Sequence, residues 1–136
     1  MLKYMLDTNI VIYAIKNRPP QIRDSFKKHQ GRMCISTVTL GELIFGAEHS
    51  QQVERNLADI EAMIARMEVL PLDNGVAYHF GQIRAELYRI GQPIGPYDMM
   101  IAGHARSSGL ILVTNNTKEF KRVSGLRLEN WVETDY

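Results

Sequence analysis

The sequence predicts an α/β fold in which a parallel sheet is covered by helices on both faces. Two observations favour this fold class. Short apolar segments alternate with helix-like segments along the chain, as they do in βαβ units. The apolar segments are nearly continuous in hydrophobicity, which is typical of parallel strands without a solvated face. With 136 residues, 45% of them hydrophobic and 23% charged, the chain fits one globular domain over residues 1–136.

The first quarter of the chain predicts two strands and two helices. The segment "LKYML" (2–6) is a short buried strand, and "TNIVIYAIK" (8–16) follows as a helix. The apolar run of this helix is nearly continuous, so periodicity alone does not fix its type. A proline opens the next helix, "PPQIRDSFKKHQ" (19–30), and Gly31 closes it. The segment "RMCIS" (32–36) is the second strand.

The middle of the chain predicts three helices around a third strand. One helix covers "TVTLGELIFGAEHS" (37–50), and an amphipathic helix covers residues 51–67. The apolar residues at helical spacing in the second helix are Val53, Leu57, Ile60, Ile64 and Met67. The segment "EVLPL" (68–72) is the third strand. A long helix then runs from about residue 75 to residue 90 and stops before Gly91.

The last third of the chain completes the alternation. A turn at "QPIGP" (92–96) precedes a helix at "YDMMIAGHARSS" (97–108). The segment "LILVT" (110–114) is the most strongly apolar strand. A short helix in "NNTKEFKRV" (115–123) and an edge strand near "LRLENW" (126–131) are expected to follow.

Composition narrows the setting in which this protein works. No apolar run approaches the roughly 20 residues that cross a bilayer, and the N-terminus lacks a signal-peptide pattern. Cys34 is the single cysteine, so it cannot form an internal disulfide and is expected to be a small buried residue. These features predict a cytoplasmic protein that does not engage a membrane.

The charge is unevenly distributed although the net charge is only +1. Residues 16–32 and 106–127 are strongly basic, whereas residues 42–86 are acidic. The basic residues form two sets: Lys16, Arg18, Arg23, Lys27, Lys28 and Arg32, then Arg106, Lys118, Lys121, Arg122 and Arg127. If several acids are gathered in one site, the rest of the surface is basic and can bind the phosphate backbone of a nucleic acid.

Acidic and amide side chains lie where predicted strands meet predicted helices. They are Asp7, Glu42, Asp98, Asn116 and Glu119. Asp7 can simply cap its helix, Glu42 fits a capping box with Thr39, and Asp98 favours the positive end of a helix dipole. Because parallel strands end at one edge of the sheet, the same residues can also converge into one site.

Glu42 is the residue that a structural role explains least well. Ser36 or Thr37 is the better start for this helix, which places Glu42 more than one turn inside. Its neighbours are apolar: Leu40, Leu43, Ile44 and Phe45. A carboxylate in such surroundings is costly unless it is paired or binds a cation. Converging carboxylates raise one another's pKa, and oxygen ligation of Mg²⁺ or Mn²⁺ relieves their repulsion.

Other catalytic chemistries have weaker support. The four histidines lack zinc-site spacing and fall in segments interpreted as exposed helix faces and helix ends: His29, His49, His79 and His104. The sequence contains neither a glycine-rich phosphate loop nor a G-x-S-x-G elbow. A metal-free nuclease with a catalytic histidine remains an alternative at this point.

Four ordered blocks of the sequence resemble a known family. They are "MLDTNI" (5–10), "ISTVTLGEL" (35–43), "IGPYDMMIAGHA" (94–105) and "LILVTNNTKEF" (110–120). Together they resemble the PIN-domain ribonucleases and, more narrowly, the VapC-type toxins of bacterial toxin–antitoxin pairs. The resemblance covers the whole chain in the right order. It implies a three-layer α/β/α sandwich with a central parallel sheet.

The resemblance also implies roles for individual residues. Asp7, Glu42 and Asp98 are expected to bind Mg²⁺, or Mn²⁺ as a substitute, and to act in catalysis. Many PIN domains have a fourth aspartate where this chain has Asn116, which is expected to ligate or to orient water while Glu119 adds charge. The groups expected to support these side chains are Thr8, Asn9 and Thr114.

By the same resemblance, the protein is expected to be a metal-dependent endoribonuclease and a toxin. The expected substrate is structured RNA, with initiator tRNA cut in its anticodon loop as the leading candidate, so that translation is inhibited. Hydrolysis should leave 5′-phosphate and 3′-hydroxyl ends. A cognate antitoxin is expected to place a helix on the apolar surface of "IVIYAI" (10–15) and "LIFGA" (43–47). The toxin is expected to be a homodimer within a toxin–antitoxin hetero-oligomer.

Two other interpretations remain at this level. A response-regulator receiver needs an acid next to Asp7 and a phospho-accepting aspartate after the third strand, where only Asp73 stands. A haloacid-dehalogenase-type phosphatase, which belongs to the same first interpretation, needs a second acid two residues after Asp7, where Asn9 stands. The second interpretation is a non-enzymatic, PIN-like module that binds RNA or protein. Asn116 favours such a decayed site, whereas the three intact acids argue against it.

Overall fold

Five parallel strands form one sheet at the centre of the protein. The computed structural model describes residues 1–132, and residues 133–136 of the predicted domain lie outside the described residues. The strand order is β3-β2-β1-β4-β5, and each neighbouring pair is parallel. The strands are β1 (Tyr4–Leu6), β2 (Met33–Ser36), β3 (Glu68–Leu70), β4 (Ile111–Val113) and β5 (Leu128–Glu129). The predicted parallel sheet is confirmed.

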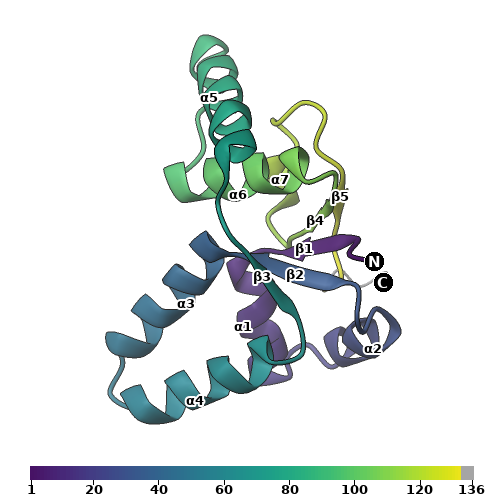
Figure 1. The fold of residues 1–136 in the computed structure, drawn as a ribbon, viewed down its shortest axis with the longest axis vertical. Coiled ribbons are helices and arrows are strands. Elements are labelled where there is room, and N and C mark those ends of the chain that lie inside the picture. The colour runs from purple at the N-terminus through teal and green to yellow at the C-terminus, as the bar shows by residue number, and fades with distance from the viewer. Residues whose placement is uncertain (133–136) are drawn as a thin grey trace.

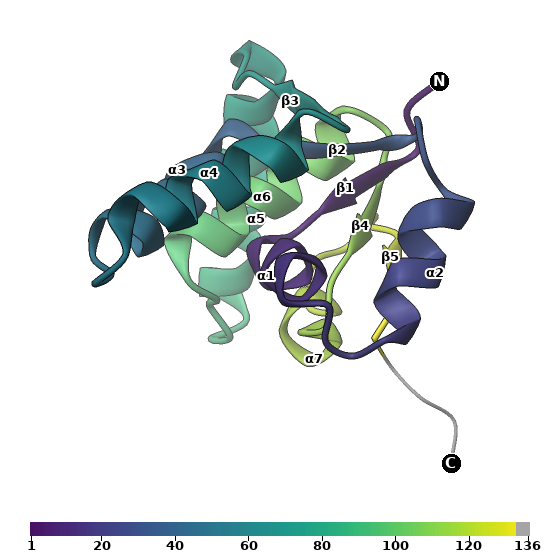
Figure 2. The same ribbon diagram turned by 90° about the horizontal axis from the view of Figure 1, so that it is seen from below.

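Helices cover both faces of the sheet (Figure 1). They are α1 (Thr8–Lys16), α2 (Gln21–Lys28), α3 (Thr37–Glu48), α4 (Val53–Ile64), α5 (Asn74–Arg89), α6 (Pro96–Ser107) and α7 (Thr117–Phe120). Figure 1 shows α1–α4 on one side of the strands and α5–α7 on the other, and Figure 2 looks onto the α1–α4 layer. This is the predicted three-layer α/β/α sandwich.

Successive side chains of each strand point to opposite faces of the sheet, so a separate hydrophobic core lies on each face. Tyr4 and Leu6 of β1 pack into the cluster beneath α1–α4, whereas Met5 packs into the cluster beneath α5–α7. In β2, Cys34 faces the α5–α7 layer, and it is fully buried as predicted. Because both faces of each central strand are covered, these strands contain almost no polar side chains.

Two helices are at least four residues shorter than the sequence predicts, and α3 ends two residues earlier than predicted, at Glu48. The helix expected over residues 19–30 is α2, which ends earlier because Gly31, with a φ of +81°, turns the chain toward β2. The helix expected over residues 51–67 is α4, which ends at Ile64 because residues 65–67 form a tight turn into β3. Apolar periodicity continues through this turn, so the pattern alone overestimates the helix.

The C-terminal elements are also reduced in length. The helix expected over residues 115–123 is the single turn α7, and the edge strand expected over residues 126–131 is the two-residue β5. β5 pairs with β4 and closes that edge of the sheet. In residues 1–132, no helix is long and apolar enough to cross a membrane.

The strand order creates a switch point beside β1. The chain fills the sheet from β1 through β2 to β3, and then returns to the other side of β1 to form β4 and β5. The switch point therefore lies between the carboxyl ends of β1 and β4. Open α/β sheets bind their ligands at this position. The β1–β4 ladder pairs Leu6 with Val113, so Asp7 and Thr114 leave the sheet side by side.

Candidate active site

Asp7 is a helix cap and also a buried acid at the switch point. The residue is 5% exposed and directly follows β1. The Ile10 N–H donates to Asp7 Oδ1 at 3.0 Å, which caps α1. The Thr114 hydroxyl donates to Asp7 Oδ2 at 2.5 Å. The cap explanation is therefore right, but the second oxygen is held by a residue more than 100 positions away.

Glu42 is brought to the same edge by α3. As the sequence indicates, Ser36 caps this helix, with its Oγ accepting from the Val38 N–H at 3.1 Å. The Thr8 hydroxyl donates to Glu42 Oε1 at 2.7 Å. Thr8 is the first residue of α1, so this hydrogen bond joins the helix that Asp7 caps to the helix that presents Glu42.

The surroundings predicted for Glu42 are partly wrong. Leu43 is buried, but Phe45 is 68% exposed and Ile44 is 38% exposed. Glu42 itself is half-buried. The cost of keeping a carboxylate there is consequently smaller than the apolar neighbours in the sequence indicate, because much of that apolar surface faces outward.

Asp98 gives the clearest sign that the acids share one site. It is half-buried in the first turn of α6, after Gly95 at the N-cap and Pro96. Burial raises its pKa to about 6, and the charges of Glu42, Asp7 and Glu119 add to the rise, in that order. The carboxylates of Glu42, Asp7 and Glu119 therefore lie close enough to act on Asp98, from two other helices and one strand end.

The pKa of Asp7 is raised as well. Burial is the largest cause, while the hydrogen bonds from Thr114 and from the backbone of Ile10 lower the pKa and offset part of the effect. The charge of Glu42 raises it further. The charges that raise the pKa of Asp7 and of Asp98 lie at one edge of the sheet, and they form a negatively charged site that attracts a cation.

The remaining predicted residues support this edge in different ways. Thr114 is fully buried, and its Oγ accepts from the Asn116 N–H at 2.9 Å while it donates to Asp7. Asn116 stands at the N-cap of α7, and Glu119 lies within that helix. Asn9 contributes its backbone N–H to Asp7, whereas the residue itself is exposed.

The chemistry of these side chains fits a hard divalent cation. The side-chain atoms near the switch point that can bind a metal are carboxylate, hydroxyl and amide oxygens. Mg²⁺ and Mn²⁺ prefer oxygen ligands over the nitrogen and sulfur ligands of zinc. Within residues 1–132, no three His, Cys, Asp or Glu side chains are drawn together as a closed metal cluster. The hydrogen bonds from Thr8 and Thr114 hold two of the acids in their present orientations.

Comparison with known proteins identifies the family. The PIN domain family matches residues 4–126 of this chain. The chain belongs to the PIN domain family. A Shigella flexneri relative named tRNA(fMet)-specific endonuclease VapC is 64% identical over 131 residues, covering 96% of this PIN domain protein and 99% of the relative. A Salmonella typhimurium protein of the same name is 60% identical, with the same two coverages.

Solved structures of VapBC complexes share the fold of this PIN domain. DNA-bound VapBC from Salmonella typhimurium aligns with a TM-score of 0.93 and 60% identity, covering 96% of this chain and 99% of that chain. VapBC2 from Rickettsia felis, bound to a promoter DNA fragment, aligns with a TM-score of 0.91 and 36% identity over the same shares. These matches favour the nuclease interpretation over the receiver and phosphatase interpretations.

Two hollows adjoin the acids of the PIN domain. A groove of about 250 Å³ between α1, α3 and α4, here called the α1 groove, reaches Glu42 and is lined by Ile12, Ile15, Leu43 and Ile60. A second hollow of about 670 Å³, here called the aromatic pocket, lies on the other side of Glu42. Its lining includes Thr8, Val38, Phe45, Tyr97 and Met100. Phe45 therefore lies outside the groove that the sequence predicts for it.

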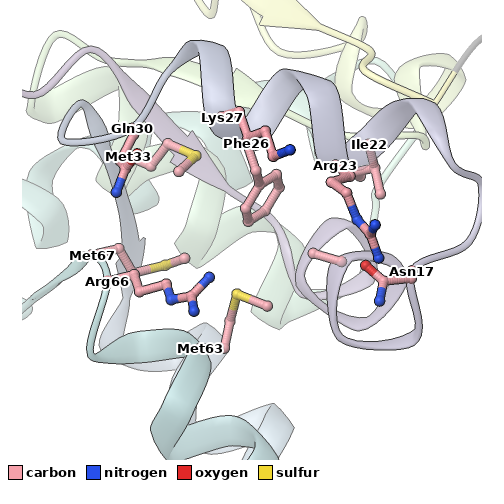
Figure 3. Close-up of a pocket in the computed structure, with 11 residues that line it drawn as sticks. Asn17, Ile22, Arg23, Phe26, Lys27, Gln30, Met33, Met63, Arg66 and Met67 are labelled. Atoms are coloured by element: carbon pink, nitrogen blue, oxygen red, sulfur yellow. The ribbon is translucent and has the colours of Figure 1, made fainter.

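A third hollow lies between α2 and α4, in the layer that Figure 2 faces. This α2–α4 pocket has a volume of about 420 Å³. Figure 3 shows methionine and phenylalanine side chains converging in it, with cationic side chains around them. The apolar members include Phe26, Met33, Met63 and Met67, and the cations are Arg23, Lys27 and Arg66. Part of the basic stretch 16–32 thus belongs to this pocket.

His104 is a second residue whose surroundings differ from those that the sequence predicts. The pattern indicates an exposed helix face, yet the residue is 2% exposed, and its Nδ1 lies 2.8 Å from Ser36 Oγ. The signal for burial is its position in "IAGHARSS", between the small residues Gly103 and Ala105. Small neighbours on a helix allow close packing, and a Cβ at position 103 would approach the backbone of Phe80 to 2.9 Å.

Proposed function

We propose that this single-domain protein is a Mg²⁺-dependent endoribonuclease that acts as the toxin of a toxin–antitoxin pair. The observation that carries the proposal is the raised pKa of Asp98, to which the charges of Glu42, Asp7 and Glu119 contribute from distant parts of the chain. The names of the VapC relatives from Shigella flexneri and Salmonella typhimurium support the same activity. The intact acids favour an active enzyme over a decayed, PIN-like binding module.

Asp7, Glu42 and Asp98 would hold the cation, for which Mn²⁺ is a possible substitute. Asn116 and Glu119 would complete the catalytic set from α7, the amide by ligating or orienting water and the acid by adding negative charge. A bound divalent cation would lower the pKa of a water and neutralise charge on a phosphate. In the proposed hydrolysis, the water oxygen joins phosphorus, the bond to the 3′-oxygen breaks, and that oxygen takes a proton.

The chain prepares these acids before any substrate arrives. Thr114 and the Ile10 N–H fix both oxygens of Asp7, and Thr8 fixes one oxygen of Glu42. These two acids are therefore restrained, and cation binding would still have to draw them together with Asp98, because no three acids in residues 1–132 already form a metal cluster. The raised pKa of Asp98 keeps that residue partly protonated near pH 6, so full ionisation accompanies cation binding.

The proposed substrate is tRNA, with initiator tRNA as the leading candidate and its anticodon loop as the site of cleavage. The names tRNA(fMet)-specific endonuclease of two relatives support this choice. An anticodon loop presents unpaired nucleotides whose backbone can enter a site at the edge of a sheet. The protein would act in the cytoplasm, where its cleavage of initiator tRNA would inhibit translation.

A cognate antitoxin is the proposed protein partner, as in the VapBC complexes that share this fold. The α1 groove and the α2–α4 pocket both border α1 and α4, and they share no lining residue. An antitoxin chain that runs from one hollow to the other would cover apolar side chains in both, and its acidic residues would complement the cations of the α2–α4 pocket. A basic antitoxin side chain in the α1 groove would face Glu42, which lines it.

A second copy of this chain is the other proposed partner. Phe45 is 68% exposed and Tyr97 is 58% exposed, and both line the aromatic pocket beside the acids. Ile44 adds a partly exposed apolar side chain on the same helix. Exposed apolar groups clustered in this way are typical of protein interfaces. The toxin would therefore form a homodimer within the toxin–antitoxin assembly.

Sequencing RNA ends after brief expression tests the proposed function. We expect one dominant new cut in a tRNA, with a 5′-phosphate on the downstream fragment. Expression of an Asp98→Asn variant from the same vector should leave the tRNA pool intact. Ends that carry a 2′,3′-cyclic phosphate would contradict the metal mechanism and favour histidine chemistry. Unchanged RNA in cells that tolerate the protein without any partner would contradict the toxin assignment.

A further inference from the structure

His104 joins three segments that surround the proposed active site. It lies on α6, the helix that carries Asp98. Its Nδ1 is 2.8 Å from the Oγ of Ser36, the N-cap of the helix that carries Glu42. Its ring also makes a hydrogen bond to the backbone of Pro71, which must be to the carbonyl oxygen because proline has no N–H.

The surrounding hydrogen bonds fix the protonation of this ring. Ser36 is fully buried, and its Oγ already accepts from the Val38 N–H at 3.1 Å. The Pro71 carbonyl can only accept, so the N–H of a neutral ring is at Nε2, and the Ser36 hydroxyl proton then points toward the unprotonated Nδ1. Every polar atom of a neutral imidazole is satisfied. A second ring proton would require the buried Ser36 hydroxyl to find another acceptor.

The environment of the ring agrees with a neutral imidazole. Burial lowers the pKa of His104, while the charge of Asp73 and the bond to Pro71 act in the opposite direction. Asp73 is exposed at the N-cap of α5, and so its charge is screened by solvent. The ring thus serves as a fixed hydrogen-bonding bridge and carries no charge.

We propose that His104 is a positioning residue that fixes the spacing between Glu42 on α3 and Asp98 on α6. This inference rests on the proposed function of those acids. Asp98 precedes His104 by six residues, and Glu42 follows Ser36 by six residues, which is about 9 Å along each helix. The bridge therefore links two helical arms of equal length that end at the acids. A small rotation of either helix at the bridge displaces its acid at the far end.

Two conservative substitutions separate the two bonds of the ring. In His104→Asn, the side-chain carbonyl occupies the place of Nδ1 and can accept from Ser36, so the link to α3 is kept. In His104→Gln, the amide reaches the place of Nε2 and can donate to Pro71, so the link to α3 is broken. Each variant removes one buried hydrogen bond, and both melting temperatures should fall by similar amounts.

The two variants should differ in catalysis. We expect the Asn variant to keep a kcat near that of the wild type and the Gln variant to lose about 10- to 100-fold in kcat with little change in KM. The rise in melting temperature on adding Mg²⁺ should also be smaller for the Gln variant. His79→Gln is the matched control. His79 accepts a hydrogen bond from Arg106 at 2.9 Å, and Arg106 lies beyond His104 on α6, outside the segment that joins His104 to Asp98. This control should lower stability without changing kcat.

Nitrogen NMR of the wild-type imidazole supplies a measurement that does not depend on activity. His104 should show a protonated Nε2 and an unprotonated Nδ1 from about pH 5 to pH 8, across the ordinary histidine range. A protonated Nδ1, or equal kcat and equal Mg²⁺ response in the Asn and Gln variants, would overturn the inference. If the wild type cleaves no RNA, the proposed function fails. The NMR tautomer and the Mg²⁺-dependent melting temperatures still test whether His104 positions the two acids.

Discussion

At the scale of single residues, Asp7 shows why a structural role and a functional role need not exclude each other. Its Oδ1 caps α1 through the Ile10 N–H, which is all that a turn residue has to do. Its Oδ2 is held by Thr114, which follows β4. A cap requires an oxygen acceptor but no negative charge, so the charge of Asp7 is the property that distinguishes the two roles.

Replacing Asp7 by asparagine tests that charge. Asparagine caps a helix about as well as aspartate, so the fold should be kept. Repulsion from Glu42 disappears, whereas the Thr114 hydroxyl loses its acceptor at Oδ2, so without Mg²⁺ the two effects oppose each other and the variant should be close to the wild type in stability. RNA cleavage should fall by about 100-fold or more, since even supporting groups around a metal cost 10- to 100-fold. Thermal melts and a cleavage assay on both proteins measure these effects.

Asp73→Asn is the matched control for this substitution. Asp73 also caps a helix, with its Oδ1 accepting from the Val76 N–H at 3.1 Å, but it stands at the start of α5. The control should keep full cleavage and the full stabilisation by Mg²⁺, which is about 2.7 kcal/mol at a concentration 100 times the Kd. An Asp7→Asn protein that gains as much from Mg²⁺ as this control would remove Asp7 from the site.

Asp98 predicts how the protein responds to pH. Its pKa rises from 3.8 to about 6 on folding, so the folded state binds this proton more tightly than the unfolded state. Without metal, stability should therefore decrease as pH rises from about 4 through about 6. Asp98→Asn should reduce that decrease and leave the part that comes from the raised pKa of Asp7. Thermal melts of both proteins between these pH values, in a chelating buffer, measure the difference.

The same ionisation predicts the opposite trend for cation binding. Mg²⁺ competes with the proton on Asp98, so the stabilisation by Mg²⁺ and the rate of cleavage should both increase with pH through about 6. Cleavage that stays constant from pH 5 to pH 7 would contradict a role for this carboxyl.

At the scale of elements, the sequence predicts every strand and helix but not all of their ends. Apolar runs identify the strands because both faces are buried. Periodicity overestimates α4, since apolar residues continue through the turn into β3. The site follows from strand ends because parallel strands terminate at one edge. His104 and Phe45 escape this reasoning, because a helical pattern does not say which neighbouring element covers an apolar face.

The two basic stretches differ once the elements are placed, although the sequence treats them alike. Lys27 and Lys28 lie at the end of α2, which leads into the amino end of β2. The acids follow the carboxyl ends of the strands, at the opposite edge of the sheet. Lys118 and Lys121 are exposed on and just after α7, the turn that carries Glu119. Phosphates bound at the acids should therefore contact the α7 pair.

Alanine substitutions of each pair test this difference. Lys118→Ala with Lys121→Ala should weaken RNA binding and reduce the salt dependence of log K by about one unit for each phosphate that is no longer bound. Lys27→Ala with Lys28→Ala should change both quantities less. Filter binding or fluorescence anisotropy at several salt concentrations, with Mg²⁺ omitted to prevent cleavage, provides the comparison. Equal effects of the two pairs would show that the RNA covers both edges of the sheet.

At the scale of the whole molecule, the exposed apolar side chains predict assembly. Phe45→Glu introduces a charge into the aromatic pocket and should shift the protein toward the monomer, because a second copy would have to bury that charge. The change should alter stability by no more than about 0.5 kcal/mol, since the side chain is exposed in one copy. Tyr78→Glu is the control, because Tyr78 is 74% exposed on α5 and lies outside the pocket.

Sedimentation velocity across a range of protein concentrations measures this shift. The wild type and Tyr78→Glu should sediment as dimers at concentrations where Phe45→Glu sediments as a monomer. A wild type that remains monomeric at all concentrations would leave the aromatic pocket without a second copy. A dimer that survives the Phe45 substitution would place the dimer interface elsewhere on the molecule.

The central claim is that acids gathered from three parts of one chain bind a divalent cation and hydrolyse RNA. Incubating purified protein with initiator tRNA, with Mg²⁺ or with a chelator, and identifying the fragment ends tests it most directly. We expect cleavage in the anticodon loop in Mg²⁺ alone, leaving a 5′-phosphate and a 3′-hydroxyl. Intact tRNA in Mg²⁺, or cleavage that continues in the chelator and leaves a 2′,3′-cyclic phosphate, would contradict this claim.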